Sequence, residues 1–566
     1  MRQRRSAAIA VAVAVAASTL LALLVRVFSL RALPIFGDEA IFLRLAAIAE
    51  RDPIGRLWIS LQESQPPLHV WLLALFLPLS PDPVLAGRAL SVVAGVLCVP
   101  AAAWAARRTL EAFGADPLDA GIGTGATAAL LALCPFFVFS GRLARVDALF
   151  LLETILAAGL AVAIASASGA RARPLGILFG LAMGLTMLSR QAVSYPLWGL
   201  PPIAWALLSP SRRAGAGRGL AALAAAAALA LALWIPMLLA PGAPDAFTRI
   251  FHNADYRPAM SAAARVRMTL AALRLAAEVF WTYLTPPVCV LAAIGAAGLA
   301  ARASGRRLLA FIALWAALLF VPAAAFAANY FPRYALPAAV PLCILAGLGA
   351  ARLWSLLAPR VQRTPARASL AGVFLLVLAP SFLDLLRGER DWRDWRLLPI
   401  DRLQFLSGPP AGFASEAAAG ALRRIAAEPA VRTIAVLTPG ISGNPTDAVW
   451  ILLGSDSRIR LSYTGDALAR PLLPDAGANG MRRLPGDARD PLALPEEIPA
   501  EMPVYAVVPD PLLTRAGWVD AVPFLSRLNP RMSEVARFRN PGEPGFGSGS
   551  GSPSSAVVVL ELPPAR

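Results

Sequence analysis

Residues 84–108 read VLAGRALSVVAGVLCVPAAAWAARR, a long and mostly apolar stretch that ends on two arginines. A helix needs roughly 20 apolar residues to cross the hydrocarbon core of a bilayer, so this stretch predicts a membrane-spanning helix. Similar blocks recur through the first two thirds of the chain, and hydropathy predicts about eleven spans. We place them near residues 6–27, 84–106, 120–139, 147–169, 174–189, 192–209, 219–240, 280–301, 308–328, 336–356 and 368–386.

The composition of the 566 residues agrees with a membrane protein. Hydrophobic residues make up 57% of the chain and charged residues only 15%, whereas a soluble domain usually carries about a quarter charged residues. A segment in lipid must satisfy its backbone polar groups internally, and barrel strands show only weak alternation. These long apolar blocks are therefore expected to be helices.

The net charge of +17 could indicate nucleic acid binding, but the distribution of the arginines argues against a nucleic acid partner. They cluster in every second connection between the expected spans, which is the pattern of cytoplasmic loops. This alternation predicts a multi-pass protein with a cytoplasmic N-terminus and an extracytoplasmic C-terminal region. The first apolar run is longer than the core of a signal peptide, so we expect it to be retained.

The domain organisation follows from a change in composition near residue 390. We expect a transmembrane domain over residues 1–390, which includes a structured first outer loop at residues 31–83. In that loop, AIFLRLAAIAE (40–50) and PPLHVWLLALFLPL (66–79) are typical of short interfacial helices. DWRDWR (391–396) mixes tryptophan with arginine, as an interfacial anchor does.

Residues 391–566 have the pattern of a small soluble α/β domain. One amphipathic segment, ASEAAAGALRRIAAE, predicts a helix at residues 414–428. Short apolar runs bounded by Gly, Pro and Asp predict strands. These runs are RTIAVLT (432–438), IRLSYTG (459–465), PVYAVVPD (503–510) and SAVVVLELPP (555–564).

Adjacent carboxylates at Asp38 and Glu39 follow the first span by about ten residues, at the expected outer surface. Acids near a helix N-terminus interact well with the helix dipole, so one interpretation is an ordinary helix start. The other is a functional site, because more ionisable residues are expected on the same face. Such groups are costly in lipid and usually face a cavity or one another. They are Arg142, Arg145, Asp147, Arg190, Arg333 and Tyr334.

Several short motifs, in this order and on one face, resemble the GT-C superfamily of membrane glycosyltransferases. They are GDEAIF (37–42), ESQPPLHVWLLALF (63–76), GRLARVDALFLLE (141–153), LSRQA (188–192) and FPRYALPAAVP (331–341). Within that superfamily the chain is most similar to the bacterial protein O-mannosyltransferase and aminoarabinose transferase type, known as family 39. The resemblance covers about the first 400 residues, and the tail resembles the extracytoplasmic domain of some bacterial members.

The resemblance implies a polyprenyl-phosphate sugar as donor and a lipid, glycan or protein hydroxyl as acceptor, at the outer face of a bacterial cytoplasmic (inner) membrane. It implies that Asp38 is the base that deprotonates the acceptor and that Glu39 orients it. It also implies that the lipid phosphate is bound by Arg142, Arg190 and Arg333.

Two further expectations concern His69 and metals. His69 is either a packed or interfacial histidine or a substrate-binding residue, and we include it among the substrate-binding candidates. Asp38, Glu39 and Asp147 offer the oxygen ligands that a divalent cation prefers. The spacing requires no metal and the arginines carry similar charge, so we predict no metal and no other cofactor.

Two other classes of protein compete with the enzyme. A transporter or flippase of lipid-linked sugars has the same multi-span architecture, but transporters usually show paired repeats and charges at the midplane. Here the polar residues gather at one face, which favours chemistry on a lipid head group. A non-catalytic protein that presents its tail domain to envelope partners is the third interpretation.

Overall fold

The computed structural model has two compact units, and each is interrupted along the chain. The first comprises residues 1–30, 58–72 and 88–396, and the second comprises residues 31–57, 73–87 and 397–566. The residues that the structure describes are 2–63, 65–167, 171–190, 195–208, 216–240, 243, 262–326, 331–357, 383, 387–388, 391, 394–408, 410–439, 445–464, 481–484, 496–499, 501–509, 533–540 and 556–562.

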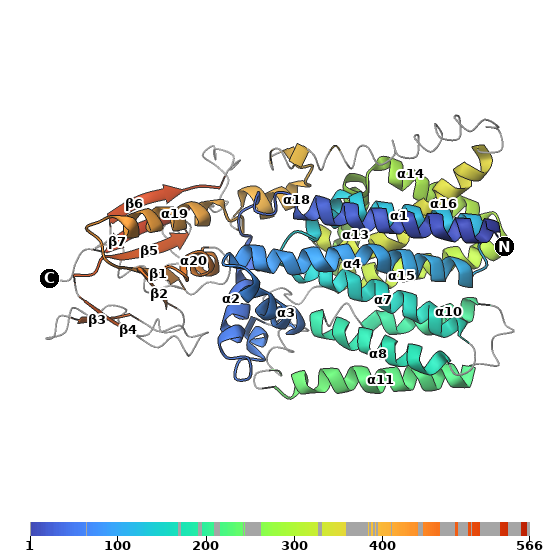
Figure 1. Ribbon diagram of the computed structural model, residues 1–566, viewed down its shortest axis with the longest axis horizontal. Coiled ribbons are helices and arrows are strands. Elements are labelled where there is room, and N and C mark those ends of the chain that lie inside the picture. Colours follow the sequence, from blue (N-terminus) through green and yellow to red (C-terminus); the bar gives the residue numbers. More distant parts are fainter. Residues whose placement is uncertain are drawn as a thin grey trace. The chain divides into compact units, whose positions relative to one another are not determined.

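The first unit is a bundle of helices (Figure 1). Its helices are α1 (Arg2–Val27), α4 (Pro83–Ala112), α5 (Pro117–Leu133), α6 (Pro135–Ser140), α7 (Val146–Ser166), α8 (Ala172–Ser189), α10 (Leu200–Leu207), α11 (Ala216–Leu238), α13 (Ala262–Val279), α14 (Pro286–Ala300), α15 (Ala303–Phe326) and α16 (Leu336–Leu357). The first residues of α4 belong to the second unit. Within the described residues, 7 helices are long and apolar enough to span a membrane, or 8 with one bent pair. The polytopic helical class predicted from the sequence is confirmed.

Three expected spans are built differently from the prediction. The block at 120–139 is split into α5 and α6 around Cys134, which precedes Pro135 and has an extended backbone. The block at 192–209 contains a 3-10 turn, Tyr195–Gly199, followed by the short helix α10. The block expected at 368–386 lies almost entirely outside the described residues.

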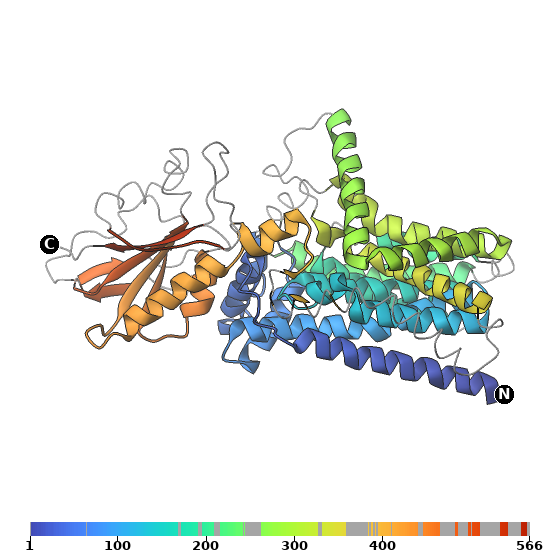
Figure 2. The same cartoon turned by 90° about the horizontal axis from the view of Figure 1, so that it is seen from above.

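The third difference is a bend of 110° between α13 and α14, where one span was expected at 280–301. A π-helical turn, Phe280–Leu284, is followed by Thr285 at φ 75° and then by Pro286. A positive φ is unfavourable for a β-branched residue and ends the helix. In Figure 2 the green helix that leaves the common direction of the bundle is α13.

Glycines allow two helices of the bundle to pack closely. Gly176, Gly180 and Gly184 recur every four residues along α8, and a Cβ on each would lie within 3.0 Å of α11 atoms. The atoms that a Cβ on Gly180 would meet belong to the Ala226 backbone. Small residues at this spacing are the usual means of bringing membrane helices together. The stripe on α8 therefore fixes the position of its C-terminal end, where Arg190 follows.

The second unit contains the C-terminal α/β domain together with parts of the first loop. From the loop come α2 (Gly37–Arg51), the end of α3 (Leu68–Phe76) and the 3-10 turn Leu77–Leu79. From the described residues of the tail come α18 (Pro399–Arg402), α19 (Phe413–Ala427), α20 (Thr446–Leu453) and the strands β1 (Ile434–Pro439), β2 (Ile459–Thr464), β3 (Met481–Leu484), β4 (Glu496–Pro499), β5 (Val504–Pro509), β6 (Ser533–Phe538) and β7 (Val557–Leu562).

The main sheet of this unit has the order β2-β1-β5-β7-β6. β1 is parallel to both β2 and β5, whereas β7 is antiparallel to β5 and β6. The central strands are buried along almost their whole length, because α19 and α20 pack on the sheet (Figure 2). The predicted helix at 414–428 and the four predicted strands are confirmed, and the sheet confirms the predicted α/β class of the tail.

Candidate functional site

Asp147 joins two arginines at the N-terminal end of α7. Its carboxylate forms ion pairs with Arg145 Nη2 at 3.0 Å and with Arg190 Nη2 at 2.8 Å. Asp147 is only 4% exposed, and it lies in the first turn of α7, where the helix dipole favours an anion. Two guanidinium groups on one carboxylate leave an excess of one positive charge. The structure thus brings together three residues that the sequence singled out.

Aromatic rings lie close to Arg190 of this group and to Arg333. The Arg190 guanidinium lies 5.5 Å from the centre of the Tyr334 ring and 5.7 Å from that of Phe150. Arg333 lies 5.5 Å from the same Tyr334 ring and 4.4 Å from Phe331. Cations are attracted to aromatic faces at these distances. Tyr334 therefore links the two arginines without adding negative charge.

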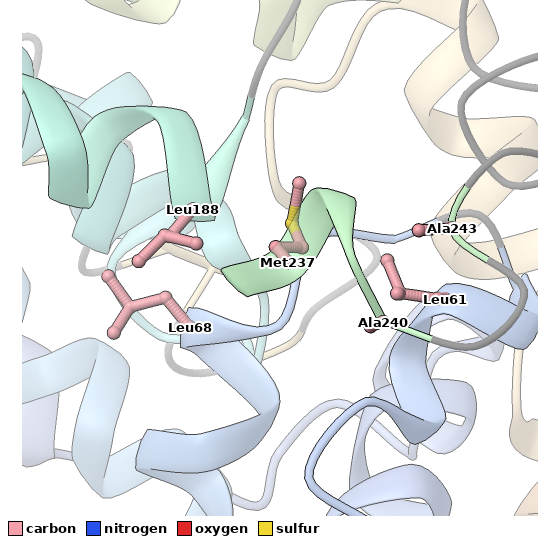
Figure 3. Packing of buried hydrophobic residues seen from close by; sticks show 6 residues of the cluster. All are labelled: Leu61, Leu68, Leu188, Met237, Ala240 and Ala243. Atoms are coloured by element: carbon pink, nitrogen blue, oxygen red, sulfur yellow. The ribbon is translucent and has the colours of Figure 1, made fainter. Parts of the chain in front are cut away.

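His69 is buried beside this cationic group, with 1% of its surface exposed. Burial lowers the pKa of His69 to about 4, although the Ala144 backbone and the charge of Asp147 act in the opposite direction. The histidine is therefore neutral near pH 7. Its neighbour Leu68 packs against Leu188 and Met237, at the ends of α8 and α11 (Figure 3). This packing holds the loop that carries His69 against the helix end that carries Arg190.

Arg142 lies in a different setting from the Asp147 group. Its Nη2 donates to the carbonyls of Phe28 at 2.6 Å and Ser29 at 2.8 Å, just after α1. Its guanidinium lies 5.5 Å from the ring of Trp395, which is itself buried and packs on Phe139. Trp395 was expected as an interfacial anchor, and the structure places its ring beside Arg142. Burial, together with nearby cations, lowers the pKa of Arg142 to about 10, so the side chain stays charged at pH 7.

Two buried arginines of the first unit were not predicted from the sequence. Arg26 donates to the carbonyls of Leu131 at 2.9 Å and Ala132 at 3.2 Å, which ties α1 to the end of α5. Arg88 donates to the Leu30 carbonyl at 2.6 Å. Each stands inside an apolar block, where an ionisable residue is costly. That rule, applied to single arginines as well as to clusters, would have found both.

Ser189 was also missed. Its hydroxyl donates to Glu153 Oε1 at 2.9 Å, and Glu153 is buried on α7. Together with the Asp147–Arg190 pair, this gives α7 and the end of α8 a second polar link. Serine next to arginine carries no distinctive pattern, so no signal in the sequence identified this contact.

Asp38 and Glu39 lie in the first turn of α2, in the second unit. Glu39 is fully buried, and its Oε2 accepts the backbone N–H of Phe36 at 2.9 Å. This contact satisfies one of the N–H groups at the helix start, as a capping residue does. Asp38 is partly exposed. The helix-start interpretation is confirmed, and the roles of both acids with an acceptor stay predictions.

In the part of the chain that the structure describes, no three His, Cys, Asp or Glu side chains gather in a way that could hold a metal ion. The four cysteines are free thiols, three of them buried. The expectation that no metal is needed stays a prediction.

Comparison with known proteins gives matches of structure and none of sequence. No family model and no curated protein matches the chain. ArnT from Cupriavidus metallidurans bound to undecaprenyl phosphate superimposes with a TM-score of 0.58 at 17% identity, over 97% of each chain. The apo form gives 0.57 at 17% identity, over 98% of each chain.

A second match is the oligosaccharyltransferase AglB from Archaeoglobus fulgidus, in complex with an inhibitory peptide and a dolichol-phosphate. It gives a TM-score of 0.51 at 13% identity, over 97% of this chain and 75% of that one. At these identities the likeness is one of fold. The chain shares the fold of these two proteins, and this confirms the fold that the sequence motifs implied.

Proposed function

We propose that the chain transfers a sugar from a polyprenyl-phosphate donor to a hydroxyl group of a lipid, glycan or protein acceptor. One observation carries the proposal. Arg145 and Arg190 meet on Asp147 with an excess positive charge, beside Arg333 and Tyr334, in a GT-C fold. The fold supports it because two matched proteins were solved with undecaprenyl phosphate and dolichol-phosphate.

The arginines act on the donor. When the bond between the sugar and the phosphate oxygen breaks, the electron pair stays on the phosphate and negative charge develops there. Fixed cations in a site poor in water stabilise this charge without reorganisation. Arg190 and Arg333 are the arginines that we assign to the phosphate, and planar guanidinium groups can bind two of its oxygens at once. We also keep Arg142 as a ligand of the lipid phosphate, the role that the resemblance to the GT-C superfamily implies.

The acceptor needs a base because an alcohol is a weak nucleophile. We assign Asp38 to take the hydroxyl proton as the oxygen attacks the anomeric carbon. The products are the glycosylated acceptor and the polyprenyl phosphate. A single displacement suffices, and the resemblance implies inversion at the anomeric carbon. Glu39 holds the start of α2, and we keep its proposed role of orienting the acceptor.

We also propose the membrane orientation that the arginine clusters predict. The N-terminus lies in the cytoplasm of a bacterial cell, and the tail domain lies beyond the cytoplasmic membrane. In this orientation Asp38, Arg190 and Arg333 all belong to the outer face, where polyprenyl-phosphate sugars are consumed.

The first experiment measures sugar transfer by the purified protein in lipid vesicles. Radiolabelled polyprenyl-phosphate sugars serve as donors and a membrane extract as acceptor. We expect Asp38→Asn to reduce transfer at least about 100-fold, the typical contribution of a general base. Glu50→Gln, on an exposed position of the same helix, is the matched control and should keep wild-type transfer.

Equal transfer by wild type and Asp38→Asn would exclude Asp38 as the base. If wild type moves labelled donor across the bilayer without consuming it, the transporter is the correct class instead.

A further inference from the structure

The helix that carries Asp38 is attached to the tail domain through a buried ion pair. Arg44 of α2 and Asp447 of α20 lie 3.4 Å apart, with side chains that are 3% and 0% exposed. The Arg44 guanidinium also lies 3.8 Å from the centre of the Trp450 ring, which is one helical turn beyond Asp447. One arginine of the first loop is thus held by both a carboxylate and an aromatic face of the tail.

The start of α2 is held by the tail as well. The Gly37 N–H donates to the Pro410 carbonyl at 2.9 Å, and the Ile35 N–H donates to Glu416 Oε1 at 3.1 Å. The Phe36 ring packs on Phe405, with 4.6 Å between ring centres. These contacts fix the backbone on the N-terminal side of Asp38.

Arg31 extends the attachment to the entry of the loop. It binds Glu416 at 3.1 Å and Asp82, near the exit of the loop, at 3.0 Å.

On the tail side, Asn540 donates to the carbonyls of Gly408 and Ala411 and accepts from the Ala414 N–H. This asparagine orders the segment that receives α2. A Cβ on Gly412 in that segment would overlap the Ile35 carbonyl, so the two backbones require this close approach.

We propose that the tail domain serves to position the acid pair, with Arg44, Asp447 and Trp450 as its positioning residues. The inference rests on the proposed function, in which Asp38 is the base. Asp38 and Arg44 are six residues apart on one rigid helix, or about 9 Å along its axis. A rotation or shift of α2 on the tail is therefore transmitted to Asp38, and a misplacement of 1 Å can cost about 100-fold in rate.

The kinetic test compares variants of Arg44 with a matched variant of Arg51, an exposed arginine at the end of the same helix. We expect Arg44→Met to lower kcat at least tenfold and to leave the KM for the polyprenyl-phosphate donor within twofold. Asp447→Asn should lower kcat in the same way, and Arg44→Lys should restore part of it. Arg51→Met should match wild type. A rise in donor KM with unchanged kcat in the Arg44 and Asp447 variants would overturn the inference.

A second measurement works without any transfer assay. Spin labels at Glu50 on α2 and Glu428 after α19, two exposed positions, report the distance between α2 and the tail in protein whose four native cysteines are replaced by alanine. We expect one narrow distance distribution, and a broadened or second population in both Arg44→Met and Asp447→Asn. An unchanged distribution in both variants would overturn the attachment, whether or not sugar transfer is found. Broadening with wild-type kcat would overturn the positioning role alone.

Discussion

At the scale of single residues, Asp147 is the most consequential side chain of the bundle. It is the only carboxylate among the described residues that the structure shows in ion pairs with two of the predicted arginines. Buried charges are tolerated when they are paired, and removing one partner leaves the other without compensation. Asp147 therefore holds Arg145 and Arg190 in place and also makes their burial tolerable.

Asp147→Asn should reduce the free energy of unfolding by about 3–5 kcal/mol, the usual cost of breaking a buried pair. The matched control is Glu111→Gln, which removes the carboxylate of the Arg107–Glu111 pair, whose side chains are 50% and 46% exposed. An exposed pair of this kind contributes about 0.3–0.5 kcal/mol. Thermal unfolding of the two variants in the same lipid mixture compares them. If both midpoints fall equally, Asp147 is not the centre of the buried charge group.

His69 should make the stability of the protein depend on pH. Its pKa is about 4 in the folded protein and close to 6.5 when unfolded, so the unfolded chain binds more protons between these values. Stability should therefore be full above pH 6.5 and fall as the pH drops from 6.5 towards 4. We expect His69→Gln to lose less thermal stability than wild type between pH 7 and pH 5. Parallel losses in both proteins would show that His69 is not buried in its neutral form.

Candidate residues could be predicted from the sequence where a charged residue lies at the end of an apolar segment. Arg145, Asp147 and Arg190 were named from their positions at span ends, and the structure joins them. The capping contact of Glu39 follows from its position in the first turn. By contrast, the backbone partners of Arg142 and the attachment of Arg44 depend on residues far away in the chain. No local pattern contains that information.

At the scale of elements, hydropathy located the helices better than it located their ends. An apolar block indicates how many residues are buried away from water, whereas the position of a helix break depends on backbone geometry. Pro135 and Pro286 were visible in the sequence, and a proline disfavours helix in the residue before it. Thr285 at positive φ was not predictable, because threonine rarely adopts that conformation. In the tail, strand β6 was missed since its residues SEVARF are mostly exposed and lack an apolar face.

The packing of α8 on α11 should be sensitive to the addition of a single methyl group. We expect Gly180→Ala to lower the thermal midpoint, because its Cβ would lie 2.6 Å from the Ala226 Cα. It should also raise the donor KM, since α8 ends at Ser189 and Arg190 follows directly. The control is Gly125→Ala, where the nearest atom to a Cβ is 3.7 Å away. If Gly180→Ala leaves both the donor KM and the thermal midpoint unchanged, α8 and α11 do not need to approach each other this closely.

At the scale of the whole molecule, the two units do not follow the order of the chain. Residues 31–57 and 73–87 belong to the same unit as the tail, although the sequence placed them in one stretch with the spans. Composition could not predict this, because it describes how polar a segment is and not which other segment it packs on. The second unit resumes at Leu397, and the domain boundary near residue 390 stays a prediction.

The contact between Arg31 and Glu416 joins residues 385 positions apart, and this separation has a consequence during biosynthesis. At roughly 5–20 residues per second, the ribosome needs about 20–80 s to make the intervening chain. For that time α2 has been synthesised but has none of its tail contacts. The residues of the tail that hold α2 are thus made long after α2 itself. The nascent chain can insert its first helices before α2 has any of these contacts.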